Sequence, residues 1–87
     1  MLLEDDAVKT ALARLRRAEG QVAGVIRMLE QGRDSKDDVT SLAAVIRALE
    51  KAGFSIVASG LKQCVTAGGE QGQLDLAQME KLFLSLA

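Results

Sequence analysis

The chain offers very few side chains that could do chemistry, and most of those are cations. It contains one cysteine, Cys64, and no histidine. No serine–histidine–aspartate set and no cysteine–histidine pair is therefore available for nucleophilic catalysis, and no glycine-rich phosphate-binding loop follows a strand pattern. The acidic clusters lie where helices are expected to begin, and helix capping explains them. We expect a protein that is not an enzyme.

Basic residues are concentrated in the first third of the chain. Residues 9–33 include six basic and two acidic residues, a local excess of four positive charges in a chain of net charge −1. The six are Lys9, Arg14, Arg16, Arg17, Arg27 and Arg33. Such a patch is the electrostatic footprint of a nucleic-acid binder. A solvated helix face carrying ion pairs would have the same composition, so both interpretations stay open.

An apolar repeat runs through the same segment. Apolar residues recur every seven positions in two series offset by three: Val8, Leu15, Val22 and Leu29, then Ala11, Ala18 and Val25. This repeat predicts a helix over about residues 6–30, packed along a seam against another helix. The polar positions form two neighbouring faces, one with Arg14, Arg17 and Gln21 and the other with Lys9, Arg16 and Arg27. We expect an apolar seam and a basic outer surface on one helix.

Two further helices are predicted, at about residues 35–66 and 74–86. Gly32 ends the first helix, and Ser35 followed by Asp38 has the spacing of a capping box for the second. Residues 67–72 hold three glycines and predict a flexible break, after which Asp75 is the expected cap of the last helix. The result is an all-α chain in which a long antiparallel hairpin precedes a short C-terminal helix. A hairpin cannot bury its own apolar stripes, so we expect two copies to form a four-helix bundle.

Length and composition limit the architecture and the compartment. Eighty-seven residues suffice for a single domain, residues 1–87, which is marginal alone and gains stability from association. One cysteine cannot form an internal disulfide, so an oxidising compartment is not implied. No signal peptide or membrane-spanning stretch is visible. We expect a soluble cytoplasmic protein with no membrane partner.

The same stretches resemble a known family. The segment RLRRAEGQVAGVIRML (residues 14–29) strongly resembles the first-helix signature of the copper-sensing repressor family (the CsoR/RcnR group), and the resemblance continues through residues 45–49 and 61–65 to the C-terminal helix. It implies a three-helix protomer, a dimer built as an antiparallel four-helix bundle, a dimer of dimers, and double-stranded operator DNA as partner. The residues it implies for DNA contact are Arg14, Arg16, Arg17, Gln21 and Lys51. Ala23 stands where an arginine is common.

The resemblance also implies a copper site, and here the chain departs from the pattern. Copper-sensing members bind Cu(I) with one cysteine near the start of the second helix and, from the other protomer, a histidine and a second cysteine near its end. These positions hold Ser35, Gly60 and Cys64, and only the last retains its ligand. Glu80 matches a glutamate that supports the ligands. The nickel, cobalt, formaldehyde and persulfide branches each require a histidine, an N-terminal proline or a second cysteine that is absent here.

Three functional hypotheses follow. The leading one is a DNA-binding transcriptional repressor, a homodimer or homotetramer, with a degenerate or altered effector site. The second is a helical oligomerisation module that modulates a homologous regulator. The third is a Cu(I) sensor with an unusual ligand set around Cys64, drawing on Met28, Met79 or Glu80. Cys64 itself is either a small buried hydrophobe or a responsive thiol, and no cofactor is assigned.

Overall fold

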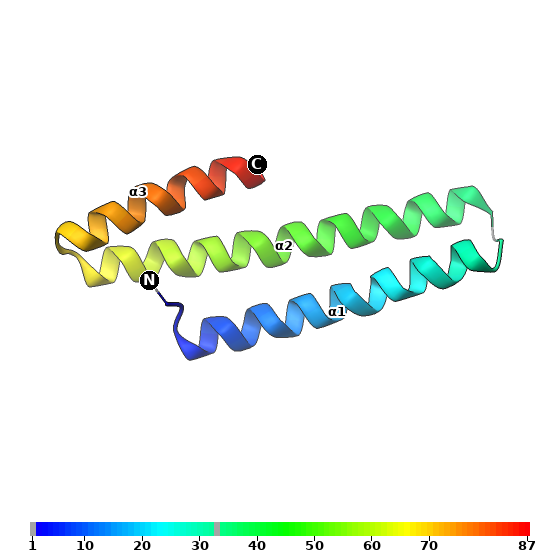
Figure 1. Ribbon diagram of the computed structural model, residues 1–87, viewed down its shortest axis with the longest axis horizontal. Coiled ribbons are helices and arrows are strands. Elements are labelled where there is room, and N and C mark those ends of the chain that lie inside the picture. Colours follow the sequence, from blue (N-terminus) through cyan, green and yellow to red (C-terminus); the bar gives the residue numbers. More distant parts are fainter. Residues whose placement is uncertain (1, 33) are drawn as a thin grey trace.

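The computed structural model describes residues 2–32 and 34–87, so Arg33 lies outside the described part of the chain. It contains three helices: α1 (Asp5–Glu30), α2 (Ser35–Ala67) and α3 (Gly69–Leu86). α1 and α2 form a long antiparallel hairpin, and α3 folds back along the C-terminal half of α2 (Figure 1). The predicted all-α class and hairpin are confirmed, and the described residues include no strand.

The turn between α1 and α2 differs from the prediction in its cap. Gly32 has a φ of 66°, the left-handed conformation expected after the end of α1. The N-cap of α2 is Asp34 rather than Ser35, because the Asp34 carboxylate accepts a hydrogen bond from the Lys36 N–H at 2.8 Å. The predicted capping box at Ser35 and Asp38 is therefore wrong by one position.

The third helix begins five residues earlier than predicted. Gly68 and Gly69 have φ values of 65° and 70°, so two residues reverse the chain and α3 starts at once. Asp75 lies inside the helix, where its carboxylate accepts a hydrogen bond from the Gln71 side chain at 3.2 Å. The glycines that predicted a flexible break instead allow close packing, because Gly72 is buried against α2.

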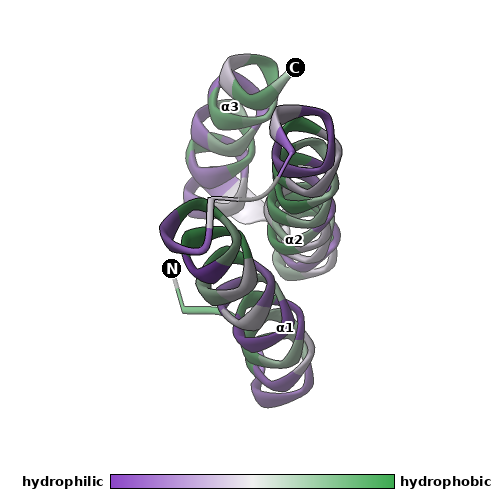
Figure 2. Ribbon diagram, turned by 90° about the vertical axis from the view of Figure 1, so that its right-hand side faces the viewer, coloured by the Kyte–Doolittle hydropathy of each residue, from purple (hydrophilic) through white to green (hydrophobic). Residues whose placement is uncertain are grey.

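The interior of the hairpin is built from small residues at heptad spacing. Ala11, Ala18 and Val25 of α1 pack against the side of α2 that carries Val45 and Ala52, and all five are buried. α3 packs on a different side of α2, where Phe54 and Phe83 meet edge to face with ring centroids 5.5 Å apart. Seen along the long axis, α1 and α3 each contact α2 (Figure 2).

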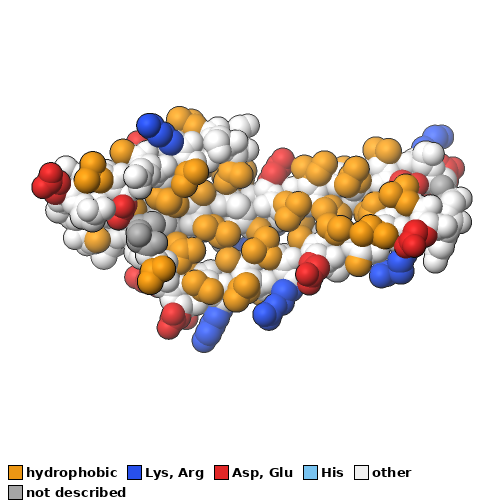
Figure 3. Space-filling view, viewed as in Figure 1, with side chains coloured by type: hydrophobic (Ala, Val, Ile, Leu, Met, Phe, Trp, Pro, Cys, Tyr) orange, Lys and Arg blue, Asp and Glu red, His pale blue; other side chains and the backbone are white. Residues whose placement is uncertain are grey.

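The protomer is a thin slab with an uncovered apolar surface. The Cα positions extend 55 × 24 × 13 Å and have a radius of gyration of 16.7 Å, whereas a compact chain of this length would have about 12 Å. Its accessible surface is 6478 Å² against about 4,900 Å² for a typical monomer of this mass. Hydrophobic side chains gather over α1 and α2 in Figure 3. This shape favours association with a further surface.

We call the uncovered surface the apolar face. Its members are Val8, Leu15, Val22, Ile26 and Leu29 of α1 with Leu42, Ile46 and Leu49 of α2, each 38–61% exposed. The predicted seam of α1 therefore divides. The series Ala11, Ala18 and Val25 packs inside the hairpin, and the series Val8, Leu15, Val22 and Leu29 stays on its surface. None of the described helices is both long and apolar enough to span a membrane.

Candidate nucleic-acid interface

A cleft between α1 and α2 collects cations from both helices. Its volume is about 370 Å³, and its polar lining is formed by Arg14, Arg17 and Gln21 of α1 with Arg47 and Lys51 of α2. Residues three and four apart share a helix face, so each helix presents its basic side chains as one row. Ala44 and Ala48 complete the lining, and no carboxylate contributes to it. We call this site the basic cleft; its composition suits an anion.

Arg14 gives the basic cleft a more specific chemistry. Its Nε atom is buried and has no hydrogen-bond partner among the described residues. An unsatisfied buried donor costs roughly 1–3 kcal/mol, so a ligand that accepts its hydrogen bond is favoured. Guanidinium groups match phosphate oxygens in a bidentate geometry, and Arg47 supplies a second guanidinium across the same cleft. The arrangement therefore suits a phosphate group.

The predicted DNA-contact residues are only partly brought together. Arg14, Arg17, Gln21 and Lys51 all line the basic cleft, but Arg16 does not. Two positions along a helix rotate a side chain by about 200°, which places Arg16 on the far edge of α1 from Arg14. Basic side chains are visible along that outer edge of α1 in Figure 3.

Arg47 is the cleft residue that the sequence did not single out as a contact. It lies in the stretch VIRALEK (residues 45–51) with Glu50 and Lys51, and no marked local excess of positive charge draws attention to it. The available signal was its spacing of four from Lys51, which places both on one face of α2. Only the packing of α2 against α1 shows that this face meets Arg14 and Arg17.

The basic cleft continues along the hairpin into a less polar groove of about 260 Å³. This groove is lined by Gln21, Gly24, Val25, Met28, Ser41 and Ala44. Because Gln21 and Ala44 belong to both, the two hollows form one surface running toward the turn. In helical projection this surface lies on the opposite side of the hairpin from the apolar face. The hairpin thus separates a polar groove from an apolar surface.

The residue types at the positions that the resemblance assigns to copper do not supply its ligand set. Ser35 starts α2, and Cys64 lies 29 residues later on the same helix, about 43 Å away along its axis, so these two positions can meet only between two protomers. Gly60 and Cys64 are both buried on α2, but glycine supplies no side-chain ligand. Among the described residues, no three His, Cys, Asp or Glu side chains are placed to share an ion. The residues present do not fit the family's Cu(I) site.

The other suggested ligands are also scattered. Glu80 is exposed on α3, beside an apolar hollow lined by Leu61, Phe83 and Leu84. Met28 lies next to Ser41, and 23 residues of α2, about 35 Å, separate Ser41 from Cys64. Within one protomer, Met28 therefore cannot join Cys64, while Met79 and Glu80 lie on α3.

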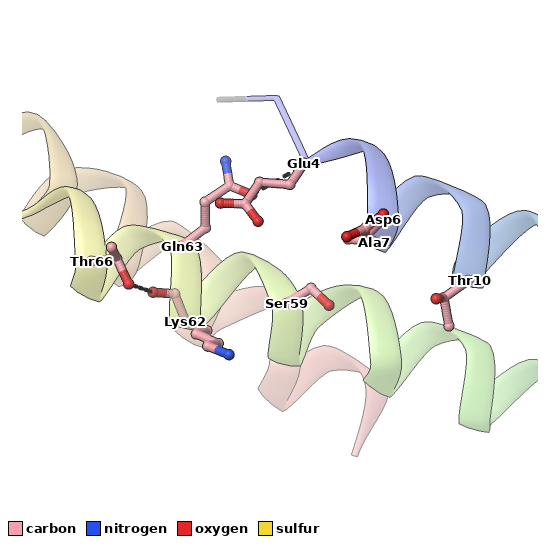
Figure 4. Close-up of a pocket in the computed structure, with 8 residues that line it drawn as sticks. All are labelled: Glu4, Asp6, Ala7, Thr10, Ser59, Lys62, Gln63 and Thr66. Carbon is pink, nitrogen blue, oxygen red and sulfur yellow. Dashed lines mark hydrogen bonds between the residues drawn. The ribbon is translucent and has the colours of Figure 1, made fainter.

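A second polar cleft holds the N-terminal segment against α2 (Figure 4). The Gln63 side chain forms two hydrogen bonds with the backbone of the N-terminal segment. Its amide nitrogen donates to the Leu2 carbonyl, and its amide oxygen accepts from the Glu4 N–H at 3.1 Å. The cleft has a volume of about 360 Å³ and is lined by Glu4, Asp6, Ala7, Thr10, Ser59, Lys62, Gln63 and Thr66. Gln63 thus fixes the entry of the chain into α1.

Comparison with known proteins identifies the class. A model of the family described as metal-sensitive transcriptional repressor matches residues 7–85. The chain therefore belongs to this family. It is 39% identical over 59 residues to the copper-sensing transcriptional repressor RicR of Mycobacterium tuberculosis (strain ATCC 25618 / H37Rv), a match that covers 68% of this chain and 62% of RicR. The chain thus spans less than two thirds of that relative.

A second relative is described only as the uncharacterized protein YrkD of Bacillus subtilis (strain 168). It is 41% identical over 46 residues, which cover 53% of this chain and 73% of YrkD. No solved structure matches the chain. The family assignment agrees with the resemblance seen in the first helix.

Proposed function

We propose that the protein is a DNA-binding transcriptional repressor that contacts the phosphates of a double-stranded operator through the basic cleft. The observation that carries this proposal is the composition of the cleft, with four cations from two helices and no carboxylate in its lining. Arg14 and Arg47 provide forked guanidinium donors, Lys51 and Arg17 add charge, and the Gln21 amide adds a neutral donor and acceptor. The proposed role is non-catalytic and cytoplasmic.

The proposed working form is a homodimer or homotetramer in which residues 1–87 act as one DNA-binding and oligomerisation domain. The excess surface of the slab and the apolar face support this form, since two hairpins joined by these faces would make a four-helix bundle. The basic cleft lies on the other side of the hairpin and would stay open. Several clefts on one assembly would then engage one duplex together, which multiplies a modest affinity per protomer.

The proposed repressor does not respond to Cu(I) through the family ligand set. Ser35 is a poor ligand for a soft metal, and Gly60 provides none, so Cys64 alone remains of the three positions. RicR is described as copper-sensing, but similarity to it does not supply the missing ligands to this chain. We infer an altered or absent effector site.

The test is fluorescence anisotropy of labelled DNA from the gene's own upstream region, titrated with protein at two salt concentrations. We expect Arg14→Ala, Arg47→Ala and Lys51→Ala each to weaken binding about 5- to 20-fold and to lower the slope of log affinity against log salt by about one per lost phosphate contact. Arg16→Ala is the matched control, because Arg16 lies outside the basic cleft; we expect less than about a 3-fold change.

Two results would contradict this assignment. Binding that survives all three cleft substitutions, or that depends on Arg16 more than on Arg47, would show that the cleft is not the contact surface. Addition of Cu(I) is expected to leave the affinity unchanged. Release of the DNA by stoichiometric Cu(I) would instead require a ligand set other than the three family positions.

A second function, that of a helical oligomerisation module, is favoured by two features together. The apolar face is open, and two of the three metal-ligand positions hold residues that do not bind Cu(I). A chain that can associate but lacks the ligands could join a metal-competent relative and modulate it. Co-expression of the two chains followed by native mass spectrometry distinguishes the hypotheses. Mixed assemblies combined with weak, sequence-independent DNA binding would favour the oligomerisation module over the repressor.

A further inference from the structure

The groove beside the basic cleft has a lining that contact with DNA does not explain. Val25 and Met28 of α1 and Ala44 of α2 form its apolar walls, and its polar side chains are Gln21 and Ser41. Among the described residues, no charged side chain lines it. The phosphates that carry most of the affinity of a duplex gain nothing from apolar walls. The groove therefore suits a different kind of ligand group.

The groove and the basic cleft are two ends of one hollow, charged at one end and apolar at the other. Gln21 and Ala44 line both parts. Along α2, Lys51 in the cleft and Ser41 in the groove are ten residues apart, about 15 Å. The two volumes, of about 370 and 260 Å³, together fall within the range of small-molecule sites, roughly 300–1,000 Å³. The hollow fits an elongated molecule with a negative head and an apolar body.

The charged end is prepared for one phosphate head. The buried Arg14 Nε lacks a hydrogen-bond partner among the described residues, and a phosphate oxygen is a strong acceptor for it. Arg47 provides a second guanidinium from α2, and the Gln21 amide lies at the junction with the groove, where it can donate to the same head. The donors thus converge on the end of the hollow from which the apolar walls lead away.

The apolar end has room for a hydrocarbon body. An added Cβ on Gly24 would lie 3.8 Å from Arg27 Nη2, an ordinary van der Waals distance, so the groove is open beside this position. Met28 forms part of the wall, and its unbranched thioether chain adapts to ligands of different shape. A large side chain at position 24 would fill the groove and leave every cation of the cleft in place.

We propose that the basic cleft and the groove together form an effector site for a soluble amphipathic organic phosphate. Its head occupies the cations proposed to contact the operator, and its body lies in the groove, so ligand and duplex exclude one another. Binding therefore releases DNA, a response that needs none of the family's metal ligands. The release rests on the proposed function, whereas binding of the ligand does not.

The first test is isothermal titration calorimetry of the intact, assembled protein without DNA. The probe is decyl phosphate below its micelle-forming concentration. Inorganic phosphate supplies the head alone, and decyltrimethylammonium supplies the same body with the opposite charge. We expect decyl phosphate to bind at least about tenfold more tightly than either. Equal binding of decyltrimethylammonium or of inorganic phosphate would overturn the site.

Two substitutions test the two ends of the hollow. Arg14→Ala removes the head donor and Gly24→Leu fills the groove, and each should weaken decyl phosphate about tenfold. Gly20→Leu is the matched control, because it makes the same change one turn earlier on α1, where an added Cβ meets no atom within 4 Å. Its affinity should stay within about twofold of the unaltered protein. Unchanged affinity in Gly24→Leu would overturn the site.

Fluorescence anisotropy of labelled operator DNA then tests the release. Decyl phosphate should displace DNA from the unaltered protein, and displacement from Gly24→Leu should need about tenfold more. DNA binding without decyl phosphate binding overturns this inference alone. Decyl phosphate binding with the expected variant pattern but without DNA binding supports the site and overturns the proposed function. Binding to vesicles of phosphatidylcholine and phosphatidic acid, but not to monomeric decyl phosphate, would assign the surface to a membrane and overturn the inference.

Discussion

At the scale of single residues, two glycines in helices have opposite surroundings. Gly72 of α3 lies against α2, where an added Cβ would be 3.0 Å from the Cys64 carbonyl oxygen and 3.8 Å from the Ala67 carbonyl carbon. Gly20 of α1 has no atom within 4 Å of an added Cβ. Gly72 is therefore required by packing, whereas Gly20 only costs helix propensity, roughly 1 kcal/mol relative to alanine.

Substituting both glycines by alanine tests this difference. Gly72→Ala should lower the free energy of unfolding by about 1–2 kcal/mol, because displacing backbone outweighs the gain in helix propensity. Gly20→Ala should raise it by up to about 1 kcal/mol. Urea denaturation followed by far-UV circular dichroism, at matched protein concentration, measures both. A stabilised Gly72→Ala variant would mean that α3 does not approach α2 so closely.

The residue scale also shows the limit of sequence reasoning about the site. Arg14, Arg17 and Gln21 were found because they lie on one face of one helix, a property that spacing alone determines. The cleft also contains Arg47, which the sequence did not single out, and it leaves out Arg16, because its lining depends on which faces of two helices meet. The loss of metal ligands at Ser35 and Gly60 needed no structure, since residue type alone decides it.

At the scale of elements, helix starts depend on single hydrogen bonds that the sequence leaves ambiguous. Asp34 and Ser35 are both good cap residues, and the structure assigns the bond to the Lys36 N–H to Asp34. The early start of α3 could not be predicted for a related reason. A cluster of glycines is compatible with a flexible loop and also with a tight chain reversal followed by a closely packed helix. The helices themselves were predictable because their apolar repeats are long.

The cap assignment gives a prediction with an internal control. Asp34→Ala should lower the free energy of unfolding by about 1 kcal/mol, because it removes the acceptor for an otherwise unpaired amide at the start of α2. Ser35→Ala should change it by less than about 0.5 kcal/mol, because the Ser35 side chain is not the cap. Thermal or urea unfolding of the two variants measures both changes in the free energy of unfolding. A larger effect at Ser35 would restore the predicted capping box.

At the scale of the whole molecule, the protomer contains only part of a hydrophobic core. Its buried apolar residues are mostly alanine and valine, with Val57 and Cys64 under α3, while its leucines and isoleucines are largely on the surface. A slab 13 Å thick in its Cα positions has one layer of helices and cannot bury both sides. These large side chains therefore become buried only if a second layer covers the apolar face.

This argument predicts that a charge on the apolar face separates the assembly. Ile46→Glu and Leu42→Glu place a carboxylate where a second copy is proposed to pack, and burying an unpaired charge costs several kcal/mol. Sedimentation velocity should show a shift from the unaltered assembly toward the 9.2 kDa protomer, with loss of helical content, because a single slab is marginal alone. Ala58→Glu, at an exposed position of α2 outside this face, is the matched control and should leave the assembly intact. If Ile46→Glu sediments like the unaltered protein, the apolar face is not the surface that joins the copies, and the association must use another surface, such as the exposed side of α3.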